Sequence, residues 1–139
     1  MPFVDTIEQA LLDHFFADGV YTPETAGTLD LALSTTTPTD AGANFTEPVG
    51  NGYAKVDIPI ASMGAASGTA PAEKSNSSAL TFPQASGSWG TITHFGVMNA
   101  GGTVLAWGAL TTPKAVASGD TASFAIGALD FRLGKGTPG

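Results

Sequence analysis

Residues 80–110, LTFPQASGSWGTITHFGVMNAGGTVLAWGAL, carry the densest β-strand pattern of the chain together with both of its tryptophans. Between Thr91 and Met98 both alternating faces are largely apolar, which is typical of a strand in the middle of a sheet or beneath a second layer. Residues 99–102, NAGG, supply turn chemistry that tolerates positive φ, and residues 103–110 alternate again. The stretch therefore predicts a central antiparallel hairpin.

The composition of the 139-residue chain is that of one all-β domain. The chain contains 18 glycines and 9 prolines and is 42% hydrophobic, which favours many turns and short strands and argues against wholesale disorder. Charged residues make up only 12%, so small and polar residues must cover much of the surface. Such surfaces are common where subunits pack against one another.

The charge balance and the amino-terminal residues narrow the classes of partner. A formal net charge of −7 with only five Lys and Arg argues against binding to nucleic acid or to anionic membranes. The absence of cysteine excludes disulfides and thiolate metal sites. Residues 1–5, MPFVD, lack the regions of a signal peptide, and no run approaches about 18 apolar residues. We therefore expect no signal peptide and no membrane insertion.

Residues 5–16 form the one segment with a clear helical pattern. We expect Asp5 to cap this helix and Glu8 to complete a capping box, while Ile7, Leu11 and Phe15 fall on one wide apolar stripe. Two destinations compete for this stripe: the protein's own β-domain, which we favour, and a neighbouring subunit. The expected division is a helix over residues 1–19, a β-sandwich over 20–133 and a flexible tail over 134–139.

Short apolar or alternating runs predict the other strands. These lie over residues 28–34, 53–60, 78–82, 114–117, 121–126 and 128–133, with a turn at 111–113 and a mobile loop over 61–75. In the first run, Leu31 and Leu33 are expected to face the core, and Ala32 and Ser34 the solvent. Together with the hairpin this gives about eight strands, which fits an antiparallel two-sheet sandwich of Greek-key or jelly-roll type.

No constellation for catalysis or metal binding is evident. The nucleophile pattern Gly-x-Ser-x-Gly is absent, His94 fits a hydrogen-bonded structural role, and His14 fits the solvated or subunit-facing side of the helix. Asp40, Asn44 and Glu47 could line a calcium loop, but turn formation explains these residues more simply. We therefore expect a non-enzymatic protein with no cofactor and no metal.

The aromatic residues offer one binding hypothesis. Trp107 lies within an apolar strand and is expected in the core. Trp89 lies in a Ser- and Gly-rich segment, so it either joins the core or, with Tyr53 and residues 99–102, forms a platform on which a sugar ring stacks. Both alternatives are open at this stage.

Three motifs carry a family resemblance: LSTTTPTDAG at residues 33–42, TFPQASGSWGTITHFG at 81–96 and GALTTPK at 108–114. Their order and spacing, within a match from Leu11 to Phe131, resemble a family of small virion proteins of tailed bacteriophages that are often labelled tail fibre proteins. The resemblance implies a structural, non-enzymatic protein of the virion, assembled in the cytoplasm of the bacterial host. Members can sit on the head as decoration or vertex-spike proteins.

From this resemblance we expect a homo-oligomeric decoration, cement or spike protein attached to the capsid. The alternatives are a tail fibre or tail-tip protein and a receptor-binding module that recognises a host glycan. The expected partners are copies of the chain, in a trimer or another symmetric oligomer, and the major capsid or tail proteins. The candidate contact residues are Ile7, Leu11 and Phe15 on the helix, Phe45 and Glu47 in the segment 44–50, and Met63 in the segment 61–75.

Overall fold

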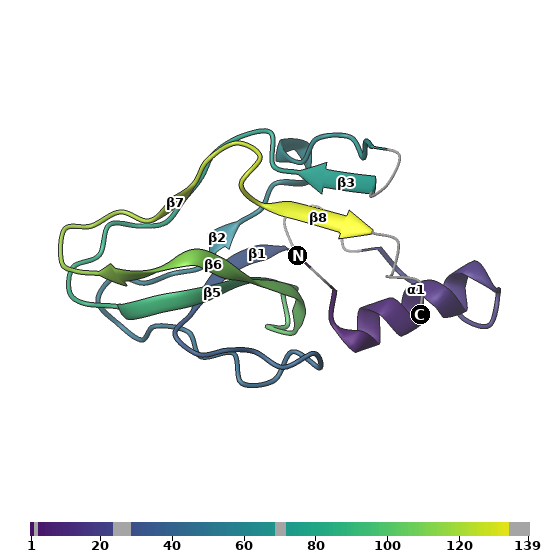
Figure 1. Ribbon diagram of the computed structural model, residues 1–139, viewed down its shortest axis with the longest axis horizontal. Helices are drawn as coiled ribbons and strands as arrows, with labels where there is room; N and C mark the ends of the chain where they lie inside the picture. Colours follow the sequence, from purple (N-terminus) through teal and green to yellow (C-terminus); the bar gives the residue numbers. More distant parts are fainter. Residues whose placement is uncertain (2, 24–28, 69–71, 134–139) are drawn as a thin grey trace.

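The computed structural model describes residues 1, 3–23, 29–68 and 72–133, and it is mainly antiparallel β-sheet with one helix near the amino terminus (Figure 1). Within these ranges the elements are α1 (Asp5–Phe15), β1 (Asp30–Ser34), β2 (Val56–Asp57), the 3-10 helix η1 (Ile60–Ser62), β3 (Ala72–Ser75), β4 (Leu80–Thr81), β5 (Gly90–Met98), β6 (Val104–Val116), β7 (Ser123–Phe124) and β8 (Asp130–Leu133). The predicted fold class is therefore confirmed. The predicted flexible tail, residues 134–139, lies outside the described residues.

The strands form two layers around the main core. One layer is a four-stranded sheet with the order β2-β1-β5-β6, and the other consists of two antiparallel ribbons, β3–β8 and β4–β7 (Figure 1). The main core joins Leu31 and Ile92 of the sheet to Phe82 and Leu129, which flank the ribbon strands. The second layer is thus two separate ribbons rather than one continuous sheet.

The predicted hairpin is confirmed as β5–β6. Two hydrogen bonds join Asn99 and Thr103 across its turn: the N–H of Asn99 donates to the carbonyl of Thr103, and the N–H of Thr103 donates to Oδ1 of Asn99, both at 3.0 Å. Gly102 takes a φ of 81°, which explains the glycine at this point of the turn.

The carboxyl-terminal half of β6 differs from the prediction. A turn at 111–113 and a separate strand at 114–117 are wrong, because β6 continues to Val116. Ile92 pairs with Lys114 and His94 pairs with Ala109, so residues 110–113 lie opposite Thr93 as a bulge. The bulge accommodates Pro113 without ending the strand.

β1 is buried on both faces, whereas the sequence pattern predicted a half-buried strand. Leu31 and Leu33 belong to the main core, but Ala32 and Ser34 are also fully buried. Ala32 packs with Val4 in a second cluster on the opposite face of the sheet. The expectation that Ala32 and Ser34 face solvent is wrong, because two segments cover that face of the sheet: the amino-terminal segment and the chain around Thr46. The N–H of Thr46 donates to Ser34 Oγ at 3.0 Å.

The segment between β1 and β4 also departs from the prediction. Only Val56–Asp57 of the predicted strand 53–60 pairs as a strand, and Ile60 at its end is 39% exposed. The predicted mobile loop, 61–75, instead contains part of η1 and the whole of β3, with residues 69–71 lying outside the described ranges. β3 is ordered by its pairing with β8, which is 55 or more positions away in the chain.

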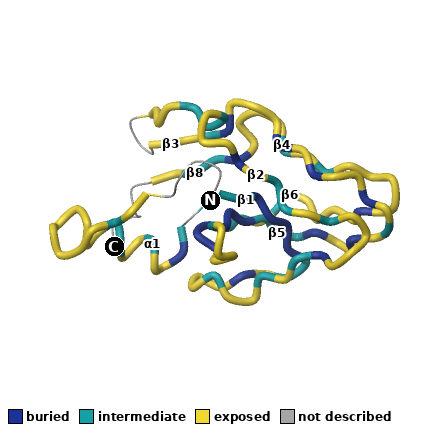
Figure 2. Tube along the Cα trace, turned by 180° about the vertical axis from the view of Figure 1, so that it is seen from behind, coloured by how far each residue is buried: buried dark blue, intermediate teal, exposed yellow. Residues whose placement is uncertain are grey.

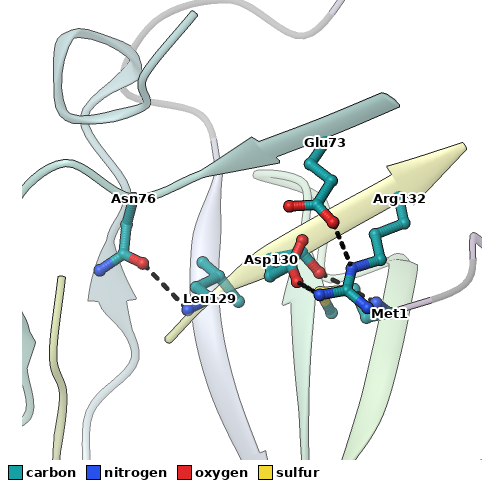
Figure 3. Close-up of polar contacts among 6 residues, drawn as sticks. All are labelled: Met1, Glu73, Asn76, Leu129, Asp130 and Arg132. Carbon is teal, nitrogen blue, oxygen red and sulfur yellow. Dashed lines mark hydrogen bonds and ion pairs between the residues drawn. The ribbon is translucent and has the colours of Figure 1, made fainter. Parts of the chain in front are cut away.

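Asn76 links the two ribbons of the second layer (Figure 3). Its Nδ2 donates to the carbonyls of Ser78 at 2.8 Å and Ala125 at 2.9 Å, and its Oδ1 accepts the N–H of Leu129 at 2.9 Å (Figure 3 draws the last of these). The residue is only 2% exposed, and all of these partners are backbone groups. The side chain therefore replaces the strand pairing that is missing between β3–β8 and β4–β7.

The helix begins at Asp5, as expected, but it is capped differently from the prediction. Val4 is the N-cap residue and makes no side-chain capping bond, so the predicted capping box of Asp5 and Glu8 is wrong. The helix start is fixed instead by the backbone: the N–H of Val4 donates to the carbonyl of Leu105 at 2.9 Å, and the N–H of Asp5 donates to the carbonyl of Asp40 at 3.1 Å. These bonds anchor the first turn of α1 on the β-domain.

Candidate interaction surfaces

The far end of α1 is an exposed apolar projection. Leu12, Phe15, Phe16 and Val20 are 59%, 80%, 74% and 87% exposed, and we call these four residues the helix tip. Figure 2 shows this end of α1 and the turn after it as exposed, whereas Val4, just before the helix, is buried. The favoured expectation that the whole apolar stripe packs on the protein's own β-domain is therefore wrong beyond Leu11, which is half-buried.

The turn after α1 holds the tip in place. Ala17 adopts a φ of 62°, and the N–H groups of Asp18 and Gly19 both donate to the carbonyl of Asp13, at 2.8 and 3.2 Å. The N–H of Tyr21 then donates to Nδ1 of the exposed His14 at 3.3 Å. The chain thus leaves the β-domain along α1, reverses direction, and returns. The hydrogen bonds of this turn hold the helix tip in a defined conformation.

An apolar hollow of about 470 Å³ lies between the base of α1, the main sheet and the β3–β8 ribbon, and we call it the hollow. Phe3 and Ile7 line it from the amino-terminal segment, Val97 and Leu105 from the hairpin, and Phe131 from β8. Tyr21 and Pro23, where the chain returns from the tip, also line it, as do Ala66, Ala72 and Lys74. No sequence pattern predicts this hollow, because its lining comes from segments far apart in the chain.

A group of charged residues lies on the β3–β8 ribbon, which borders the hollow (Figure 3). Arg132 pairs with Glu73 at 3.2 Å and with Asp130 at 2.7 Å, while the Met1 ammonium donates to the carbonyl of Asp130 at 2.9 Å. Burial lowers the pKa of this ammonium, Asp130 opposes the shift, and Arg132 adds to it. Lys74, on the neighbouring strand, donates to the carbonyl of Gly64 at 2.8 Å.

The contact residues predicted from the sequence do not form one continuous surface. Phe15 belongs to the helix tip, and Ile7 and Met63 line the hollow, while Leu11 is half-buried on the helix between them. Phe45 and Glu47 do not line the hollow: Phe45 packs on the second cluster. The contact residues predicted from the sequence did not include Leu12, Phe16 and Val20, although their apolar character at a helix end was the available signal.

Trp89 belongs to the core and not to a sugar platform. It is 4% exposed, its Nε1 donates to the carbonyl of Asn51 at 2.8 Å, and its ring lies edge-on to Phe82 at 6.4 Å between centroids. A buried ring has no free face for a sugar, so of the two alternatives left open by the sequence the structure has the core position. Trp107, expected in the core, is half-buried against the second cluster, and its Nε1 donates to the carbonyl of Thr39 at 2.9 Å.

Tyr53 is also tied into the fold. Its ring meets Trp89 edge-on at 5.3 Å, its hydroxyl donates to Oε1 of Glu47 at 2.7 Å, and the hydroxyl oxygen accepts the N–H of Leu33 at 3.1 Å. Burial raises the pKa of the Tyr53 phenol well above its ordinary value; the Leu33 hydrogen bond opposes this rise, and Glu47 adds to it. Tyr53 and Glu47 therefore act as one internal pair.

The other candidate residues have structural partners. His94 shares a hydrogen bond of 2.8 Å with Thr93 and lies edge-on to Trp107, as expected for a structural histidine. Asn44 has a φ of 61°, and its Nδ2 donates to the carbonyl of Thr37 at 2.8 Å, which fits the turn role. Among the described residues, no three His, Cys, Asp or Glu side chains come together to hold a metal ion. Within the same ranges, no helix has the length and apolar character needed to cross a membrane.

Comparison with known protein families finds a match over most of the chain. Residues 2–132 match the family described as podophage GP4 fiber I protein gp80. No curated protein matches the chain. The family match covers nearly all of the 139 residues, including α1 and all of the strands described above except the end of β8. The chain therefore belongs to the family of the podophage GP4 fiber I protein gp80, a family of phage virion structural proteins.

Proposed function

We propose that this chain is a non-enzymatic structural subunit of a virion fibre, and that it acts by binding copies of itself and another virion protein. The family match over residues 2–132 is the observation that carries this proposal, because the family is described as a fibre protein. The helix tip supports it, since four large apolar side chains kept in solvent are the usual mark of a surface that another protein covers.

The low charge of the surface fits the same role. With 12% charged residues, the chain has few groups that would have to be desolvated when subunits associate. In a virion many identical contacts act together, so each contact can be weak while the assembly is stable. Attachment to the capsid as a decoration, cement or spike protein, which the sequence led us to expect, is the alternative location.

Gold labelling of particles tests this proposal. The chain has no cysteine, so a Val49→Cys variant, altered at a side chain that is 91% exposed, carries one site for a gold label. The labelled protein is added to particles of the encoding phage that lack the gene product. We expect gold at the fibres. Gold over the head would replace the fibre assignment by capsid decoration, and particles without gold would overturn a virion role.

A further inference from the structure

The helix tip and the hollow are complementary apolar surfaces on one chain. The tip is convex and presents Leu12, Phe15, Phe16 and Val20 to solvent, whereas the hollow is concave and lined mainly by apolar side chains. Each surface alone exposes apolar area to water, which costs free energy in a free monomer.

The tip cannot enter the hollow of its own chain. Ile7, in the first turns of α1, lines the hollow, and Phe15 lies about 12 Å further along the same helix. The backbone bonds of Val4 and Asp5 fix the base of the helix, so α1 carries the tip away from the hollow at its base. An occupant with the chemistry of the tip must therefore come from a second copy.

The sizes of the two surfaces fit this occupant. A cavity of about 150 Å³ holds one benzene molecule, so a hollow of about 470 Å³ has room for the rings of Phe15 and Phe16 together. The four tip side chains expose on the order of 500 Å², taking about 150–250 Å² for a whole aromatic side chain. One tip-to-hollow contact therefore buries on the order of 500 Å² on the copy that gives the tip, which is below the roughly 800 Å² per partner of a standard interface. Each copy makes two such contacts, one through its tip and one through its hollow, so the contacts reinforce one another in the assembly.

The charges also favour a second copy. Residues 5–20 include Asp5, Glu8, Asp13 and Asp18 and contain no Lys or Arg, so the projection is acidic. Lys74 lines the hollow, and among the described residues its exposed ammonium has no ion-pair partner, whereas Glu73, which also lines the hollow, is paired with Arg132. An acidic helix entering a hollow with a lysine at its edge is attracted rather than repelled.

We propose that the helix tip of one copy inserts Phe15 and Phe16 into the hollow of the next copy, in a head-to-tail contact. This inference rests on the proposed function, because it specifies how copies of a fibre subunit associate. The two surfaces differ, so the contact is heterologous and produces either a closed ring, with a trimer as the smallest natural case, or an open filament. Both products contain the same tip-to-hollow contact.

Mixing two defective variants tests the contact. Phe15→Ser/Phe16→Ser removes the tip and keeps the hollow, while Ala66→Glu places a charge in the hollow and keeps the tip. Both sites are exposed, so both variants are expected to keep the wild-type far-UV circular dichroism spectrum and cooperative unfolding. Each variant alone should be a 13.9 kDa monomer by multi-angle light scattering, and the mixture should contain dimers of twice that mass, each with one intact contact. Val49→Ser, altered at an exposed apolar residue outside both surfaces, is the control and should keep the wild-type mass.

Two results would overturn the inference. One is a tip variant that is folded and keeps the wild-type oligomeric mass, which would mean that copies associate through another surface. The other is a mixture of folded monomeric variants that forms no dimer at concentrations where the wild type is oligomeric. In both cases gold labelling of the fibres would leave the proposed function standing, so the two failures are distinguishable.

Discussion

Replacing Asn76 by alanine should destabilise the protein more than its position in a short polar segment suggests. The change removes three side-chain hydrogen bonds, to Ser78, Ala125 and Leu129, and leaves their backbone groups without those partners at a residue that is 2% exposed. A buried group left unsatisfied costs about 1–3 kcal/mol. Since the three losses share one site and are not additive, we expect the free energy of unfolding to fall by about 3–6 kcal/mol.

Urea denaturation at fixed protein concentration measures this loss. With an m-value near 2 kcal/mol per M, which is typical of a domain of this size, the unfolding midpoint should fall by about 1.5–3 M. Asn76→Asp should be at least as damaging, because a carboxylate oxygen would then face two carbonyl oxygens that now accept hydrogen bonds. The matched control is Asn99→Ala, which loses one exposed hydrogen bond to Thr103 and should cost less than about 1 kcal/mol.

A small effect of the Asn76→Ala change on stability would contradict this prediction. If Asn76→Ala lowers the free energy of unfolding by less than about 1 kcal/mol while m is unchanged, the side chain does not join the two ribbons as the structure indicates. A loss of the same size in Asn76→Ala and Asn99→Ala would lead to the same conclusion.

Two further predictions concern the core. Gly96→Ala should lower the free energy of unfolding by about 1–3 kcal/mol, because the new Cβ would lie 2.6 Å from Cε2 of Phe45. Thermal melting should show that the double variant Gly96→Ala/Phe45→Leu recovers part of the lost stability. Equal melting temperatures of the single and double variants would contradict this prediction. The pKa of Tyr53 is raised in the folded protein, so the folded state keeps the phenol proton when the unfolded state loses it near pH 10. The stability that Tyr53 contributes is therefore fully present below pH 10 and falls above it. The free energy of unfolding should fall by at most about 1.4 kcal/mol per pH unit, and by less because the ring is only half-buried. Urea titrations between pH 8 and 11 should show a shallower decline for Tyr53→Phe, and parallel declines would show that another group is responsible.

Local patterns sufficed to predict the elements that are determined by nearby residues. The hairpin follows from two apolar strands around NAGG at residues 99–102, and the helix follows from the spacing of Ile7, Leu11 and Phe15. The helix cap was mispredicted because the amides of Val4 and Asp5 find partners in Leu105 and Asp40, which no local capping pattern reveals.

Elements determined by distant partners could not be predicted in this way. β3, with the sequence AEKS, has no apolar alternation, and it is a strand because β8 supplies hydrogen bonds and an ion pair between Glu73 and Arg132. Asn76 has the sequence neighbours of a surface turn, and its burial depends on Leu129 and Ala125. Ala32 is small and apolar, and such a residue fits either a buried or an exposed face of a strand. It is buried because Val4, far away in the sequence, packs against it.

The candidate site was predictable only in part. The pattern identified α1 as a docking element and included Phe15, but it could not decide whether the apolar stripe packs within the chain or outside it. That decision depends on where the helix base is anchored, which the backbone bonds of Val4 and Asp5 determine. The hollow brings together residues from Phe3 to Leu133, and such a surface exists only in the folded chain.

The most direct test of the account is the number of copies of this chain in purified virions, measured by quantitative mass spectrometry relative to the major capsid protein. Particles grown with the wild-type gene and with the Phe15→Ser/Phe16→Ser variant would be compared, with Val49→Ser as control. We predict a fixed copy number above one per particle for the wild type and the control, and a loss of at least tenfold for the tip variant while its folded protein accumulates in the lysate. Absence of the chain from wild-type particles, or equal incorporation of the tip variant, would contradict the account.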